Sequence, residues 1–110
     1  MRRNINTLLD LFLLDTARQN AWLKDKNIAV YVRKSRRVIE GMPVETLEIG
    51  SVSTKKPGRG FFKYFILHLE SKGQVVFVEN VFNLGLLAML VKANYTITPT
   101  EPPCAYRRPK

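Results

Sequence analysis

The sequence contains few of the residues that form disulfides and bind metals. Among its 110 residues there is one cysteine, Cys104, and one histidine, His68. A lone cysteine excludes an internal disulfide, and together with a single histidine it excludes most arrangements of zinc ligands. We therefore expect an inert thiol, no metal site and a reducing, cytoplasmic setting.

Long hydrophobic runs are also missing. The apolar run from Leu84 to Val91 spans eight residues, whereas a helix needs about 20 to cross a bilayer. Near the N-terminus, Arg2 and Arg3 precede an apolar stretch in the manner of a signal peptide, but Asp10 and Asp15 interrupt that stretch. We expect no membrane-spanning segment.

Acidic residues are scarce relative to basic ones. Nine Asp and Glu residues stand against 18 Lys and Arg residues, which gives a formal net charge of +9. Such an excess favours polyanionic ligands, namely nucleic acid, a phosphorylated cofactor or an acidic protein surface. Hydrophobic residues at 45% and charged residues at 25% are ordinary values for a globular chain. We therefore expect residues 1–110 to form one folded domain.

Periodicity predicts an α/β (α+β) domain in which helices flank a mixed β-sheet. The expected elements are, in order, a helix over 5–23 within the segment 1–24, a hairpin over 27–40 that turns at Lys34-Ser35-Arg36, a strand over 44–53, a helix over 61–71, a strand over 74–78, a helix over 83–94 and a strand over 95–98. In the C-terminal segment 96–110, Cys104 to Arg108 is expected to form a short edge strand or a loose basic tail.

One connection has an unusual composition. The segment Thr54-Lys55-Lys56-Pro57-Gly58-Arg59-Gly60 joins a predicted strand to a predicted helix. Its two glycines allow the backbone to approach a ligand closely, and the first turn of the helix offers unpaired N–H groups to an anion. Three cations, Lys55, Lys56 and Arg59, add positive charge. The segment predicts a phosphate or pyrophosphate site; a tight surface turn with solvated lysines is the alternative.

This loop resembles the first motif of the GNAT superfamily of N-acetyltransferases, where a strand, a Q/R-x-x-G-x-G/A loop and a helix form an acyl-CoA site. Here the loop reads Lys55-Lys56-Pro57-Gly58-Arg59-Gly60. Downstream, Asn83 to Tyr95 resembles the second motif of the superfamily, which runs from an Asn through a helix to Gly-Phe. The resemblance implies an acyl-CoA-binding core over 44–95, with a shortened N-terminal part before it.

By this resemblance, acetyl-CoA is the co-substrate, and backbone N–H groups of the loop would hold its pyrophosphate. Backbone groups of Val52 and Thr54 would bind the pantetheine arm. The cofactor-binding residues implied in this way are Val52, Thr54, Lys55, Lys56, Gly58, Arg59, Gly60, Phe61 and Asn83.

An N-acetyltransferase also needs a base that takes the proton of the acceptor amine. Glu48, on the strand before the loop, is the first candidate, and Glu45 and Glu79 are further ones. Each could equally be a solvated strand residue or an ion-pair partner for one of the 18 cations.

The sequence gives a weaker indication of the residue that donates a proton to the departing thiolate. In the superfamily it is often a tyrosine on the helix of the second motif, but the corresponding position here is Leu90. The Gly-Phe that ends the motif is replaced by Asn94-Tyr95. Tyr95 is therefore a candidate catalytic residue, with Tyr64 and Tyr106 as alternatives.

The sequence thus predicts a small N-acetyltransferase that moves the acetyl group of acetyl-CoA to an amine, on a protein or another macromolecule, by direct attack. A second copy of the chain is a candidate partner that would complete the acceptor pocket. The alternative is an inactive GNAT-like binding module, such as a phage or mobile-element inhibitor, that engages an acidic protein surface or nucleic acid. An unrelated nucleic-acid binder would need aromatics interleaved with cations on one face, and Tyr106-Arg107-Arg108 supplies only a fragment of that pattern.

Overall fold

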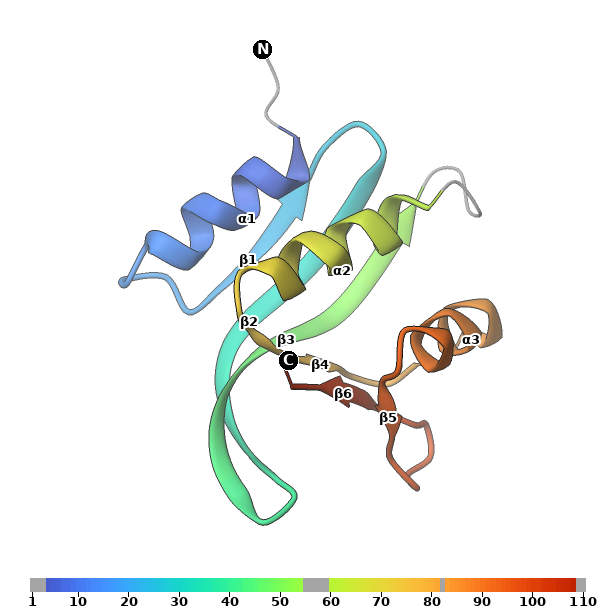
Figure 1. Ribbon diagram of the computed structural model, residues 1–110. Coiled ribbons are helices and arrows are strands. Elements are labelled where there is room, and N and C mark those ends of the chain that lie inside the picture. The colour runs from blue at the N-terminus through green and yellow to red at the C-terminus, as the bar shows by residue number, and fades with distance from the viewer. Residues whose placement is uncertain (1–3, 55–59, 82, 109–110) are drawn as a thin grey trace.

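The computed structural model describes residues 4–54, 60–81 and 83–108. Over these residues the chain folds into a six-stranded mixed sheet with three helices, and Figure 1 shows how they are arranged. The elements are, in order, α1 (Ile5–Leu14), β1 (Asn20–Lys24), β2 (Ile28–Ile39), β3 (Met42–Thr54), α2 (Phe61–Ser71), β4 (Val75–Val78), α3 (Leu84–Lys92), β5 (Thr96–Ile97) and β6 (Ala105–Arg107). The predicted α+β class with a mixed sheet is confirmed.

The strands lie in the order β1-β2-β3-β4-β6-β5. The first three form an antiparallel meander, after which β3 and β4 pair in parallel. A parallel pair needs a crossover connection, and α2 lies in that connection. β6 pairs antiparallel with β4 on one side and with β5 on the other.

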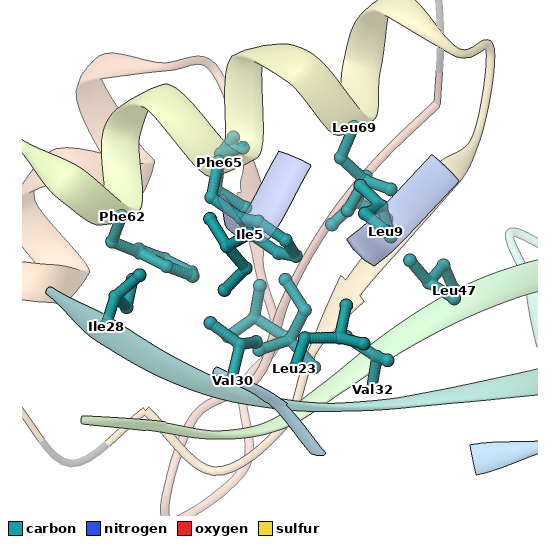
Figure 2. Packing of buried hydrophobic residues seen from close by; sticks show 14 of the residues in the cluster. Ile5, Leu9, Leu23, Ile28, Val30, Val32, Leu47, Phe62, Phe65 and Leu69 are labelled. Carbon is teal, nitrogen blue, oxygen red and sulfur yellow. The ribbon is translucent and has the colours of Figure 1, made fainter. Parts of the chain in front are cut away.

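The helices pack on one face of the sheet. In α1, Ile5, Leu9 and Phe12 recur at helical spacing and are buried. In Figure 2, side chains of α1 and α2 lie over inward-facing strand residues such as Val30 and Val32. α3 contributes Leu90 to the same core. The opposite face of the sheet therefore carries no helix among the described residues, and we call it the helix-free face.

The predicted helix over 5–23 is wrong beyond Leu14. The backbone N–H of Asp15 bonds back into the last turn of α1 and ends the helix, and polar residues follow. Ala21 and Leu23 are then buried between exposed neighbours, and this period of two belongs to strand β1. In the sequence, an apolar pattern typical of a helix is followed closely by one typical of a strand. Residues 20–24 form a strand rather than an extension of α1 because they pair with β2.

The predicted hairpin over 27–40 is also wrong, because β2 runs through this segment without a turn. The polar residues at the centre of β2 are held by contacts with the rest of the chain. Lys34 Nζ, for example, donates a hydrogen bond to the backbone carbonyl of Asp15 at 2.6 Å. The turn comes instead at Glu40 and Gly41, whose φ angles of 53° and 82° are both positive. Two successive positive φ angles are typical of a tight β-hairpin.

The short C-terminal strand is internal, which corrects the prediction of an edge strand or a loose tail over 104–108. β6 lies between β4 and β5. Ala105 is buried in the core, and Tyr106 stacks on Phe77 on the helix-free face, with ring centroids 6.4 Å apart. The other predicted elements are confirmed close to their expected bounds, although the strand over 95–98 shortens to Thr96–Ile97.

Candidate functional site

Two helices begin beyond the carboxyl ends of the parallel strands. α2 follows β3 and α3 follows β4, so both helices begin beyond the same edge of the sheet. A groove of about 550 Å³ lies between the two helices, with Lys63 and Leu67 on one wall and Ala88 and Lys92 on the other. In open α/β sheets, ligands bind at this carboxyl edge.

β3 extends past β4 at this edge. Their parallel pairing ends at Ile49 and Val78, followed by one bond from the N–H of Glu79 to the carbonyl of Ile49 at 2.9 Å. β3 nevertheless continues to Thr54. Among the described residues, the edge of β3 beyond Gly50 therefore has no strand partner on the β4 side. Its backbone donors and acceptors are open to a ligand.

A β-bulge marks the point where the two strands part. Tyr31 pairs with Ser51 and Val32 pairs with Ile49, so Gly50 has no partner in β2. A bulge bends its strand and increases its twist, which turns the end of β3 away from β4. Glycine suits this position because a Cβ there would lie 3.1 Å from Cδ2 of Tyr31. The ring of Tyr31 can thus lie across the bulge.

Among the residues that the structure describes, no side chain caps the first turn of α2. Its N-cap residue is Gly60, whose φ of 79° lies in the left-handed region. The first turn of α3, in contrast, is capped by Asn83, whose Oδ1 accepts the N–H of Leu86 at 3.0 Å. α2 thus offers backbone N–H groups to an anion, whereas the cap of α3 already uses one of the N–H groups there.

The predicted cofactor residues divide into three groups. Four of them lie outside the described residues, namely Lys55, Lys56, Gly58 and Arg59. Four lie on the unpartnered part of β3 or at the start of α2, namely Val52, Thr54, Gly60 and Phe61. Asn83 is the N-cap residue of the neighbouring helix α3, where its side-chain oxygen Oδ1 accepts a backbone N–H.

Four charged side chains form a cluster on the helix-free face, beside the point where β3 and β4 part. Glu48 is 1% exposed and forms ion pairs with Arg33 and Arg37. Glu79, directly after β4, pairs with Arg33 and lies 3.5 Å from Nη2 of Arg37. The guanidinium carbon of Arg37 also lies 3.9 Å from the ring centroid of Phe77. We call these four charged residues the carboxylate cluster.

The two glutamates of the carboxylate cluster have opposite protonation preferences. Burial raises the pKa of Glu48, but hydrogen bonds with Arg37, Glu79 and Arg33 outweigh burial and lower that pKa to about 2. The pKa of Glu79 is raised, first by its hydrogen bond with Glu48 and then by burial. A carboxylate with so low a pKa is a weak base. The electrostatics therefore favour Glu79 over Glu48 as a proton acceptor.

Tyr95 lies at the other end of α2 from the uncapped N-terminus. Its buried hydroxyl donates to Oε2 of Glu70 at 2.9 Å, and Arg107 pairs with the same carboxylate at 3.2 Å. Glu70 is in the last turn of α2, whose 11 residues span about 16 Å. Burial, together with the bond to Glu70, raises the pKa of Tyr95. The structure does not bring Tyr95 together with the carboxylate cluster, and its contacts fasten α2 to the segment after α3.

The other candidate acids and bases occupy different environments. Tyr106 lies nearest to the carboxylate cluster, because it stacks on Phe77. Tyr64 is 67% exposed on α2, and Glu45 is exposed on β3. Leu90, where the sequence resemblance would have led us to expect a tyrosine, is fully buried in the core.

Sequence reasoning missed the two arginines of the carboxylate cluster. It placed a turn at residues 34–36, which separates Arg33 from Arg37. The available signal was the strand period itself, because residues two apart lie on one face, and a continuous strand therefore places both arginines beside Glu48.

No protein-family model, curated protein or solved structure matches the chain. Within residues 4–54, 60–81 and 83–108, no group of three or more His, Cys, Asp or Glu side chains is arranged to hold a metal ion. None of the helices in these same ranges is long and apolar enough to cross a membrane.

Proposed function

We propose that the protein is a small acyl-CoA-dependent N-acetyltransferase with a GNAT-like fold, which moves the acetyl group of acetyl-CoA to an amine acceptor. The observation that carries this proposal is the parting of β3 from β4 beside the uncapped start of α2. The open edge of β3 suits the amide groups of a pantetheine arm, and the first turn of α2 suits a pyrophosphate. Coenzyme A contains both groups.

The order of the elements supports the same proposal. A long strand leads through a glycine-containing connection into α2, and a second strand then leads to a helix that begins after an Asn. This is the order in which the two motifs of the superfamily resemblance occur. The net charge of +9 also suits a co-substrate that carries several phosphates.

In the proposed reaction, the amine nitrogen attacks the thioester carbonyl carbon from the helix-free face. Glu79, whose side chain is 20% exposed, accepts the amine proton. Backbone N–H groups on the open edge of β3 polarise the carbonyl oxygen. The new C–N bond forms, the C–S bond breaks, the thiolate takes a proton from water, and Glu79 releases the amine proton to the hydroxide so formed, which restores water and the carboxylate. Arg33 and Arg37 hold Glu79 where the strands part.

The experiment is a calorimetric titration of acetyl-CoA into the wild type and two variants, Gly60→Asn and Gly60→Asp. Asn and Asp have nearly the same shape, and both are among the non-glycine residues that best tolerate a positive φ. Both also favour a helix N-cap, so the helix should be kept. The two variants differ by one negative charge at the expected pyrophosphate site.

We expect the wild type to bind acetyl-CoA and Gly60→Asn to bind it more weakly, because the new side chain would cap α2 as Asn83 caps α3. Gly60→Asp should bind about tenfold more weakly than Gly60→Asn or worse, a loss of about 1.4 kcal/mol from the added negative charge. Gly73→Asp is the matched control, because Gly73 also has a positive φ, 74°, but lies after the C-terminus of α2 with open space around it. It should bind like the wild type. Absence of binding by the wild type at millimolar acetyl-CoA, or equal loss in both aspartate variants, would refute the proposed site.

A further inference from the structure

Two aromatic rings lie on the helix-free face away from the carboxyl edge of β4, and of these Trp22 is exposed and Tyr31 is partly buried. Trp22 on β1 is 51% exposed and pairs across the strands with Tyr31 on β2. Their ring centroids are 5.5 Å apart, with the planes tilted by 51°. Nζ of Lys24 lies 5.5 Å from the ring centroid of Trp22.

The residues on the β3 side of these rings are small. Cross-strand pairing places Ser51 beside Tyr31 and Ser53 beside Ala29 on the same face, and the bulge residue Gly50 lies under the edge of the Tyr31 ring. Large side chains that would stand above the rings are absent from these positions. Trp22 therefore projects from a low surface, where a flat ligand can reach it and the accessible part of the Tyr31 ring.

The charge around the rings is positive. Lys24 is exposed beside Trp22, and the side chain of Arg33, on the same face, is 40% exposed. The two glutamates of the carboxylate cluster, Glu48 and Glu79, are already paired with arginine on this face. Arg33 is in turn paired with both glutamates, so the cation that an anion at the rings would meet first is Lys24.

We propose that this surface, made of Trp22, Lys24, Tyr31 and Arg33, binds single-stranded nucleic acid. Unpaired bases stack on exposed aromatic rings with little regard to sequence, while nearby cations contact the phosphates. A duplex keeps its bases stacked inside and cannot use the rings, and an acidic protein surface supplies charge without flat rings. The pairing of β1 with β2 assembles this surface, and it does not depend on the proposed acetyltransferase activity.

The single tryptophan of the chain makes the test direct, because Trp22 is then the only source of tryptophan fluorescence. The probe is oligodeoxythymidylate of about 12 nucleotides, within the usual site sizes of such surfaces. It is titrated into the wild type at low salt, first by Trp22 emission and then by the anisotropy of a labelled oligonucleotide. We expect quenching of Trp22 at the same concentrations at which anisotropy rises.

Matched variants test whether binding depends on the aromatic ring of Trp22. Trp22→Leu keeps an apolar side chain and removes the aromatic ring, whereas Trp22→Phe keeps a ring; Tyr64→Ala removes a 67% exposed aromatic from α2 instead. We expect Trp22→Leu to weaken binding about fivefold or more, and both Trp22→Phe and Tyr64→Ala to stay near the wild type. Far-UV circular dichroism of each variant checks the fold.

A second pair of variants tests the phosphate contact. Lys24→Gln removes the cation beside Trp22, and Lys92→Gln removes an exposed cation from α3. For single strands, each phosphate contact contributes about 0.7 to the slope of log affinity against log salt. Lys24→Gln should lower the slope by about that amount, and Lys92→Gln should leave it unchanged.

Three results would overturn the proposal. One is binding of the oligonucleotide without a change in Trp22 emission. Another is an equal effect of Trp22→Leu and Tyr64→Ala on affinity. The third is equal affinity for the single strand, a duplex of the same length and heparin, because heparin carries negative charge without bases. That last outcome identifies a general polyanion surface, as an acidic protein partner would use.

Discussion

Replacing Glu48 and Glu79 by glutamine, one at a time, should have unequal effects on stability although the two carboxylates share both arginines. The pKa of Glu48 falls from 4.5 to about 2 in the folded protein. A shift of that size corresponds to about 3 kcal/mol of stability at neutral pH. Because the side chains of Arg33 and Arg37 are 40% and 34% exposed, solvent screening reduces the expected cost of Glu48→Gln to about 2 kcal/mol.

The sign of the pH dependence differs between the two residues. A lowered folded pKa means that the contribution of Glu48 is complete above pH 4.5 and is lost as the pH falls toward 2. The pKa of Glu79 is raised, so its contribution is present below its unfolded pKa and is lost as the pH rises through the folded value. At neutral pH the neutral Glu79→Gln should therefore be as stable as the wild type, or slightly more stable.

The measurement is urea unfolding of both variants, followed by far-UV circular dichroism at neutral pH and at about pH 3. Glu45→Gln, an exposed glutamate on the same strand as Glu48, is the control and should change stability by less than about 0.5 kcal/mol. The cost of Glu48→Gln should shrink at the lower pH. Equal costs for Glu48→Gln and Glu79→Gln, or a cost that does not depend on pH, would show that the electrostatic reasoning is wrong.

Three further predictions concern the site and its supports. With acetyl-CoA and a panel of primary amines, Glu79→Gln should lower thiol release about a hundredfold or more while calorimetry shows unchanged acetyl-CoA binding; unchanged turnover excludes Glu79 as the base. Gly50→Val should cost about 1–3 kcal/mol in urea unfolding and alter Trp22 emission, because the new side chain displaces the Tyr31 ring that contacts Trp22. Tyr95→Phe should lower the free energy of unfolding by about 2 kcal/mol, because the hydrogen bond to Glu70 is lost, and should leave acetyl-CoA binding intact. Loss of acetyl-CoA binding in this variant would show that Tyr95 belongs to the binding site.

The sequence predicts the fold best from residue 42 onward. Helix α2 has a strongly periodic apolar face and ends just before Gly73, whose φ is 74°, so its bounds follow from local rules. The prediction for the N-terminal part is wrong because Ala21 and Leu23 are only two apolar residues, too few for their period of two to be distinguished from the end of the preceding helix. Their partner, β2, decides between the two patterns, and strand pairing is a long-range property.

The candidate site is predictable only in part for the same reason. Gly60 before α2 and Asn83 before α3 are local signals, and the structure places both at helix starts. The carboxylate cluster and the Trp22–Tyr31 pair are not local. Each brings together residues from different strands, so neither can be seen until the register of β2 against its two neighbours is known.

The position of β6 links the integrity of the sheet to its resistance to aggregation. β6 covers one edge of β4, whose sequence Val75–Val78 is wholly apolar, and it is also the strand with which β5 pairs. A change that detached Ala105–Arg107 would leave β5 without a partner and would turn β4 into an exposed, uncharged sheet edge. Such edges pair readily with other chains. The three residues of β6 thus protect the apolar strand β4 from pairing with other chains.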